Sequence, residues 1–208
     1  MGLRENQAQS FLAPLTGRAA TFLVESREAN LAFARTLMVQ VAGCGGASAI
    51  LDLDALYSSN SDQIFAPSDS GALSGTIIRI PQPGADLDVE LASLFEVEQK
   101  VVVIDSLNSL YHLIAQEDGS SRSRKMSFAI SSLSYFARTN SKSVILSMYR
   151  REGFLRGGST RSIASLTDCT IAVDTRGQDV IFRNEKGPGW PGGLFSIRFP
   201  SGWPHQFP

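Results

Sequence analysis

Short apolar runs alternate with longer amphipathic segments along most of the chain. The runs that predict buried strands lie at 21–24, 48–53, 76–80, 101–104 and 143–148. Apolar residues at helical spacing predict helices over 28–42 and 126–137, and an acidic start predicts a third helix over 86–96. Three further short strands are predicted at 170–173, 179–182 and 194–199, between clusters of turn residues. This order predicts an α/β domain with a mostly parallel sheet and an antiparallel edge.

The length and composition are those of one globular domain. The 208 residues are 43% hydrophobic and 19% charged, which suits a single core domain over 1–208, with an N-terminal arm at 1–14 and a tail at 204–208. Residues 57–75 are rich in Ser, Asp and Gly and predict a loop. No apolar run is long enough to span a membrane, and the N-terminus lacks the apolar region of a signal peptide. We therefore expect a cytoplasmic or nucleoid-associated protein.

Charge is divided unevenly along the chain. Residues 1–119 carry 6 basic and 15 acidic side chains, a balance of −9, whereas residues 120–161 carry 9 basic and 1 acidic, a balance of +8. The remaining residues are balanced, so the net charge of −1 hides this asymmetry. A segment this basic is typical either of a surface that faces a polyanion or of an ordinary solvated cationic face.

The segment Lys100–Leu113, KVVVIDSLNSLYHL, is the most specific motif in the chain. It is an apolar strand that ends on Asp105, at the strand end where ligands bind in open α/β sheets. With its Ser-Leu-Asn-Ser-Leu continuation it resembles the second nucleotide-binding strand of the RecA, RadA and KaiC group of ATPases. This resemblance implies a RecA-like fold of the P-loop NTPase class. It places Asp105 where the family's aspartate acts on Mg²⁺ through water.

Other segments follow the order of that family. Leu15–Val24 resembles the strand that leads into the phosphate loop, and Ile50–Tyr57 resembles the strand with the catalytic carboxylate. Asp54 stands at the carboxylate position, where a Glu is usual. Ser143–Tyr149 resembles the sensor strand, although Met-Tyr replaces the family's Asn-Gln pair, and residues 182–203 resemble the terminal hairpin.

The phosphate loop itself lacks the chemistry that nucleotide binding needs. A working loop uses glycines to expose backbone N–H groups, a Lys to neutralise phosphate charge and a Ser or Thr for Mg²⁺. The residues at this position are Glu25, Ser26, Arg27, Glu28, Ala29 and Asn30. With no Gly, no Lys and two Glu, the loop predicts that ATP hydrolysis has been lost. We therefore expect no cofactor and no metal, and we interpret Asp54 and Asp105 as vestigial.

The basic segment coincides with two loops that face DNA in recombinases of this family. The first corresponds to 119–125 and the second to 150–161, and both contain Gly and Ser. The resemblance therefore implies DNA-binding residues at Arg122, Arg124, Lys125, Arg150, Arg151, Phe154, Arg156 and Arg161. Cations supply affinity for phosphates regardless of sequence, and an aromatic ring can stack on a base.

Three interpretations follow from these patterns. The first is a catalytically degenerate recombinase paralog that binds single-stranded or junction DNA and assists an active RecA/RadA-type recombinase in recombinational repair. The second is a scaffold without DNA affinity that pairs with a RecA-fold or KaiC-like partner, with the acidic and basic parts as complementary faces. The third is an ATPase with an atypical phosphate loop.

Overall fold

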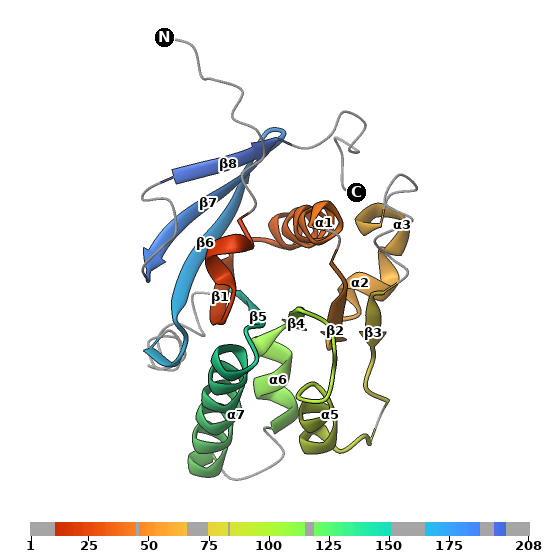
Figure 1. The fold of residues 1–208 in the computed structure, drawn as a ribbon, viewed down its shortest axis with the longest axis vertical. Coiled ribbons are helices and arrows are strands. Elements are labelled where there is room, and N and C mark those ends of the chain that lie inside the picture. Colours follow the sequence, from red (N-terminus) through yellow and green to blue (C-terminus); the bar gives the residue numbers. More distant parts are fainter. Residues whose placement is uncertain are drawn as a thin grey trace.

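The computed structural model describes residues 11–44, 46–65, 75–82, 84–114, 119–150, 165–187 and 194–198. Within this part of the chain an eight-stranded sheet has the strand order β3-β2-β4-β5-β1-β6-β7-β8 (Figure 1). The strands are β1 (Arg18–Val24), β2 (Ser48–Asp52), β3 (Ile77–Arg79), β4 (Val101–Asp105), β5 (Ser143–Tyr149), β6 (Cys169–Arg176), β7 (Asp179–Lys186) and β8 (Leu194–Arg198). Pairing is parallel from β3 to β6 and antiparallel from β6 to β8. The predicted parallel sheet with an antiparallel edge is confirmed.

Helices cover both faces of the sheet. Helix α1 (Arg27–Gly43) and the short α2 (Leu56–Ser59) and α3 (Ser61–Ile64) lie on one face, and α5 (Leu87–Ser93), α6 (Leu107–Leu113) and α7 (Gly119–Thr139) lie on the other (Figure 1). Each central strand contributes side chains to the hydrophobic core on both faces of the sheet, because successive side chains alternate between the faces. In β4, for example, Val103 enters the α1 core and Val102 and Ile104 enter the α7 core.

The N-terminal residues of the described chain are part of the core. Phe11 is buried, and its ring lies 6.3 Å from that of Phe22 and 5.4 Å from that of Phe182, measured between ring centroids. A single 3₁₀ turn, Ala13–Leu15, then leads into β1 with Leu15 fully buried. The start of the described chain is thus packed against its own sheet.

Two predicted loops are wrong. Residues 119–125 form the first turns of α7, and Met126 is its first buried apolar residue. Residues 119–125 contain no apolar side chains at helical spacing, so the hydrophobic pattern could not predict that the helix begins this early. Part of the predicted loop at 57–75 is also helical, because Tyr57 of α2 and Ile64 of α3 are buried against α1. Residues 66–74 lie outside the described chain.

Candidate functional site

The connection between β1 and α1 is only two residues long. Strand β1 ends at Val24 and α1 begins at Arg27, so Glu25 and Ser26 are the whole turn. The Glu25 N–H still donates to the carbonyl of Val173 in β6, 3.1 Å away, which continues the sheet pairing into the turn. This connection has no room for a loop that wraps around a phosphate.

The N–H groups at the start of α1 bond to the chain itself. The Ser26 hydroxyl accepts from the Ala29 N–H at 3.1 Å, the usual role of a serine N-cap. The carboxylate of Glu28 takes a hydrogen bond from its own N–H, and this bond, with help from Ser26 and the Arg27 charge, lowers the pKa of Glu28. A helix N-terminus ordinarily attracts anions. In this protein the Glu28 carboxylate itself lies at the N-terminus of α1.

A buried carboxyl group lies beside this turn, at the end of β4. Asp105 is 1% exposed, and its Oδ1 accepts from the side-chain amide of Asn30, 3.2 Å away, and from the hydroxyl of Ser147. The same Asn30 amide donates to the Tyr149 hydroxyl at 2.9 Å. Asn30 therefore joins α1 to the ends of β4 and β5. The second oxygen of Asp105, Oδ2, is buried without a hydrogen-bond partner.

The environment of Asp105 favours its protonated form. Burial raises the pKa of Asp105 to about 7, an effect that the hydrogen bonds from Ser147 and Asn30 reduce and the nearby carboxylates of Asp54 and Asp52 increase. Asp52 ends β2 directly opposite Asp105 in the parallel register, and it is also buried. One Asp52 oxygen accepts from the Ser58 N–H at 2.8 Å, and the other has no partner.

Asp54 is held on the outer side of this cluster. Its two carboxylate oxygens accept from the hydroxyls of Ser106, at 2.6 Å, and Ser109. Ser106 is also the N-cap of α6, so the same short segment orients the carboxylate and begins the helix. Asp54 is exposed and neutral donors bind it. The Asp54 carboxylate is therefore oriented by two hydroxyl groups.

Strand β5 ends in a hydrogen-bonded pair of a different kind. The Asn108 side chain accepts from the Tyr149 N–H at 2.7 Å and donates to the Tyr149 carbonyl at 3.4 Å. The Tyr149 ring is half-buried, and desolvation is the main cause that raises the pKa of its hydroxyl to about 12. Met148 is a buried core residue. At the end of β5, Tyr149 therefore belongs to the polar cluster around Asp105, whereas Met148 belongs to the hydrophobic core.

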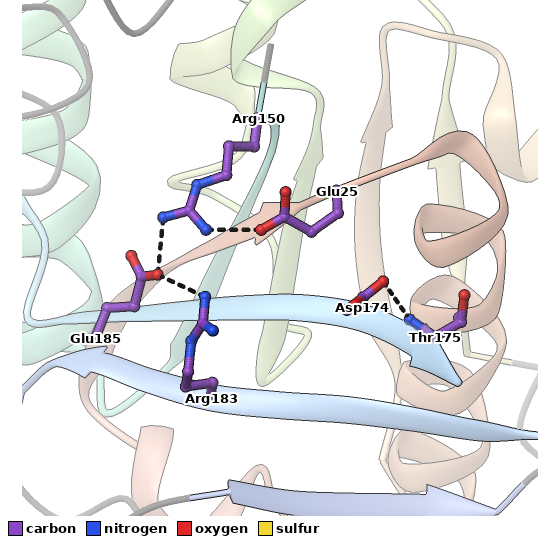
Figure 2. Close-up of polar contacts among 6 residues, drawn as sticks. All are labelled: Glu25, Arg150, Asp174, Thr175, Arg183 and Glu185. Atoms are coloured by element: carbon purple, nitrogen blue, oxygen red, sulfur yellow. Dashed lines mark hydrogen bonds and ion pairs between the residues drawn. The ribbon is translucent and has the colours of Figure 1, made fainter. Parts of the chain in front are cut away.

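Arg150, the next residue, belongs to an exposed ion-pair network (Figure 2). Its guanidinium contacts Glu25 at 2.6 Å and Glu185 of β7 at 2.8 Å, and Arg183 contacts the same Glu185 oxygen at 3.3 Å. These bonds raise the pKa of Arg150. Arg150, which is predicted from the sequence to bind DNA, is therefore already bound by two carboxylates. Its assignment to DNA stays a prediction.

The described residues do not fit a nucleoside triphosphate. The turn provides no cradle of free amides, Glu25 and Glu28 are both in or next to it, and the guanidinium of Arg150 is engaged by carboxylates. Within the same residues no three His, Cys, Asp or Glu side chains are grouped so as to hold a metal ion. We therefore derive no phosphoryl transfer at this site.

Comparison with known proteins supports the architecture. The chain superposes on the crystal structure of the RadB recombinase with a TM-score of 0.65 and 15% sequence identity, over 91% of this chain and 93% of that chain. The fold is RecA-like. No protein-family model and no curated protein matches the sequence. The RecA-like fold class predicted from the motif order is therefore confirmed.

The two basic segments predicted to face DNA are only partly described. Arg124 and Lys125 are exposed on the first turns of α7, whereas the Arg122 side chain and residues 151–161 lie outside the described part. The latter range includes Arg151, Phe154, Arg156 and Arg161. Among the residues that are described, no helix is long and apolar enough to cross a membrane.

Sequence reasoning missed several members of the strand-end cluster. Asn30 was assigned to the phosphate loop, yet its side chain bonds to Asp105 and Tyr149. Ser147 carried a usable signal, since it is a polar residue inside an otherwise apolar strand. Asp52 carried another, as the last residue of a strand in register with Asp105.

Proposed function

We propose that this chain is a RecA-fold accessory protein of recombination that binds DNA without a nucleotide. It contacts single-stranded or junction DNA through the basic segment 120–161 and assists an active RecA/RadA-type recombinase in the cytoplasm, at the nucleoid. The observation that carries the loss of nucleotide chemistry is the two-residue turn between β1 and α1, with its own carboxylate at the helix start. RecA-like architecture and the +8 balance of residues 120–161 support the DNA role.

The cations in this proposal have unequal roles. Arg124 and Lys125 lie exposed on one helix, where they can reach phosphates. Arg150 is held by Glu25 and Glu185, so we assign it to fixing the start of the following segment. Arg151, Arg156 and Arg161 then supply most of the phosphate contacts, and Phe154 stacks on a base.

A pair of variants with equal charge loss tests the DNA role. Arg151→Ala/Arg156→Ala should weaken binding of labelled single-stranded DNA and lower the slope of log affinity against log salt by about 0.7 per lost phosphate contact. The matched control is Lys100→Ala/Arg176→Ala, which removes two exposed cations outside the segment. Equal losses in the two variants would indicate non-specific attraction and would remove the assignment.

Phe154 supplies a second, independent readout. Phe154→Ala should lower affinity by about 1–3 kcal/mol if the ring stacks on a base, with no change in the salt slope because no phosphate contact is lost. Phe154→Trp should restore the affinity. If Phe154→Ala binds like wild type, the stacking role is wrong while the phosphate contacts stand.

The ATPase alternative is tested separately by thermal unfolding. A ligand that binds only the native state stabilises it by mass action, so about a hundredfold excess over Kd adds about 2.7 kcal/mol. We expect Mg-ATP to give no shift beyond that of Mg²⁺ alone. A reproducible increase in Tm with Mg-ATP would contradict the proposed loss of nucleotide binding.

A further inference from the structure

An apolar groove lies between α5 and α7, on the face of the sheet opposite α1. Its volume is about 540 Å³, and its lining includes Leu91, Phe95, Phe128 and Leu133. Both helices lie on the same side of the molecule (Figure 1). The groove shares no lining residue with the strand-end cluster, but Arg124 and Lys125, which we assign to phosphate contact, line its α7 side.

Large apolar side chains stand exposed around this groove. Phe128 is 76% exposed and Tyr135, about two turns further along α7, is 69% exposed. Val89 on α5 and Phe95 just after it are 63% and 38% exposed. A cluster of exposed aromatic rings next to an apolar groove is typical of an interaction surface.

The two sides of the groove carry opposite charge. Helix α5 and its N-cap contribute Asp86, Asp88 and Glu90 and no cation, whereas the sequence of α7 contains Arg and Lys and no acid. At the groove itself Asp88 lies on the α5 side and Arg124 on the α7 side. One face therefore holds a protruding ring, a groove, an acidic side and a basic side.

We propose that this face binds a second copy of the same chain in a two-fold symmetric dimer. In a two-fold symmetric interface, every contact between residue i of one copy and residue j of the other occurs twice. Rotation by half a turn about an axis through the groove therefore places the acidic side of each copy against the basic side of the other. The same rotation presents each Phe128 ring to the partner's groove. The partner is a second copy because this one face carries both an acidic and a basic side, and both an exposed aromatic ring and a groove that can receive it.

The apolar area is of the right order for a dimer. Covering one aromatic side chain fully removes about 150–250 Å² from water. Standard stable interfaces bury roughly 1,200–2,000 Å² in total. Phe95, Phe128 and Tyr135 are 38%, 76% and 69% exposed, so each copy contributes that share of their area, and the flanking charges set the orientation.

Sedimentation velocity on the full chain without DNA tests the dimer. Over about 0.5–100 µM, a range that brackets micromolar dissociation constants, wild type should shift from monomer to dimer. Phe128→Asp should weaken the dimer by at least about thirtyfold, which corresponds to roughly 2 kcal/mol. Ile80→Asp is the matched control, an exposed apolar residue after β3 and outside the groove. Circular dichroism shows whether both variants are folded.

A charge-reversal mixture distinguishes this geometry from other self-association. Asp88→Arg and Arg124→Asp should each dimerise more weakly than wild type, since each homodimer sets like charges against one another. Mixing the two variants should restore association, because each altered residue then meets its opposite in the partner. No contact within a single chain can produce this rescue.

Three results would overturn the proposal. The first is a monomer at every concentration, which would assign the face to a different protein or to nucleic acid. The second is a dimer with the same affinity in Phe128→Asp. The third is a mixture that associates no better than its components. Because DNA is absent, these results are independent of the DNA-binding experiments above.

Discussion

Two consecutive residues, Tyr149 and Arg150, belong to polar networks of opposite character. Tyr149 joins the buried cluster around Asp105, where neutral side chains are the hydrogen-bond donors. Arg150 joins an exposed network in which two carboxylates share two guanidinium groups (Figure 2). In the first network burial raises the pKa of Asp105; in the second, hydrogen bonds to carboxylates raise the pKa of Arg150.

The comparison shows that polar side chains at this edge of the sheet are bound by other residues of the chain. In the buried cluster the Asn30 amide donates to Asp105. In the exposed network Glu25 occupies the turn and binds the adjacent cation, Arg150. Buried and unpaired polar atoms carry large free-energy costs, whereas exposed ion pairs contribute little. The two networks should therefore respond very differently to substitution.

The largest expected effect comes from removing the titration of Asp105. Its pKa of about 7 in the folded protein lies above the ordinary aspartate pKa of 3.8, so between these values the native state holds a proton that the unfolded chain has released. The free energy of unfolding therefore falls as pH rises through this window. Asp105→Asn removes this dependence, and its stability relative to wild type should increase by about 2–3 kcal/mol between about pH 5 and about pH 8.

Urea unfolding at the two pH values measures that difference. The change in relative stability between them is insensitive to the fixed cost of altering one hydrogen bond. Asp62→Asn, an exposed position on α3, is the matched control. Parallel pH profiles for wild type and Asp105→Asn would show that Asp105 does not titrate in this range.

The next effect comes from removing the bridging amide. Asn30→Leu leaves the Tyr149 hydroxyl without its donor and Asp105 with Ser147 alone. We expect a loss of about 1–3 kcal/mol, the usual cost of an unsatisfied buried polar group. Chemical denaturation measures it, and a free energy of unfolding equal to that of wild type would show that the bridge adds nothing to stability.

A smaller effect is expected at the helix cap. Ser26→Ala removes the acceptor for the Ala29 N–H and should cost about 1 kcal/mol. Ser26→Asp keeps an acceptor at the N-cap and should retain most of the stability. If both variants unfold at the same denaturant concentration, the cap does not stabilise α1.

The smallest effect is expected in the exposed network. Arg150→Gln should lower stability by no more than about 1 kcal/mol, and added salt should diminish the difference. Arg183→Gln breaks only the 3.3 Å contact to Glu185 and should cost less. In DNA titrations Arg150→Gln should lose less affinity than Arg156→Ala. An equal or greater loss would mean that Arg150 leaves its carboxylates to bind phosphate.

The sequence predicted the architecture better than it predicted the site. Continuous β-branched runs such as Val101–Ile104 identified the central strands, and the order of motifs identified the RecA-like fold. Residues 119–125 were misassigned because short polar residues at a helix start have no apolar periodicity. The link from Asn30 to Asp105 joins residues far apart in sequence, and local patterns carry no signal for such a contact.

The most direct test of the account is an anisotropy titration of labelled single-stranded DNA over a salt series, with and without Mg-ATP. The account predicts affinity that falls steeply with salt, because several phosphates are contacted, and that is unchanged by nucleotide. No binding at low salt, or binding that requires Mg-ATP, would contradict it.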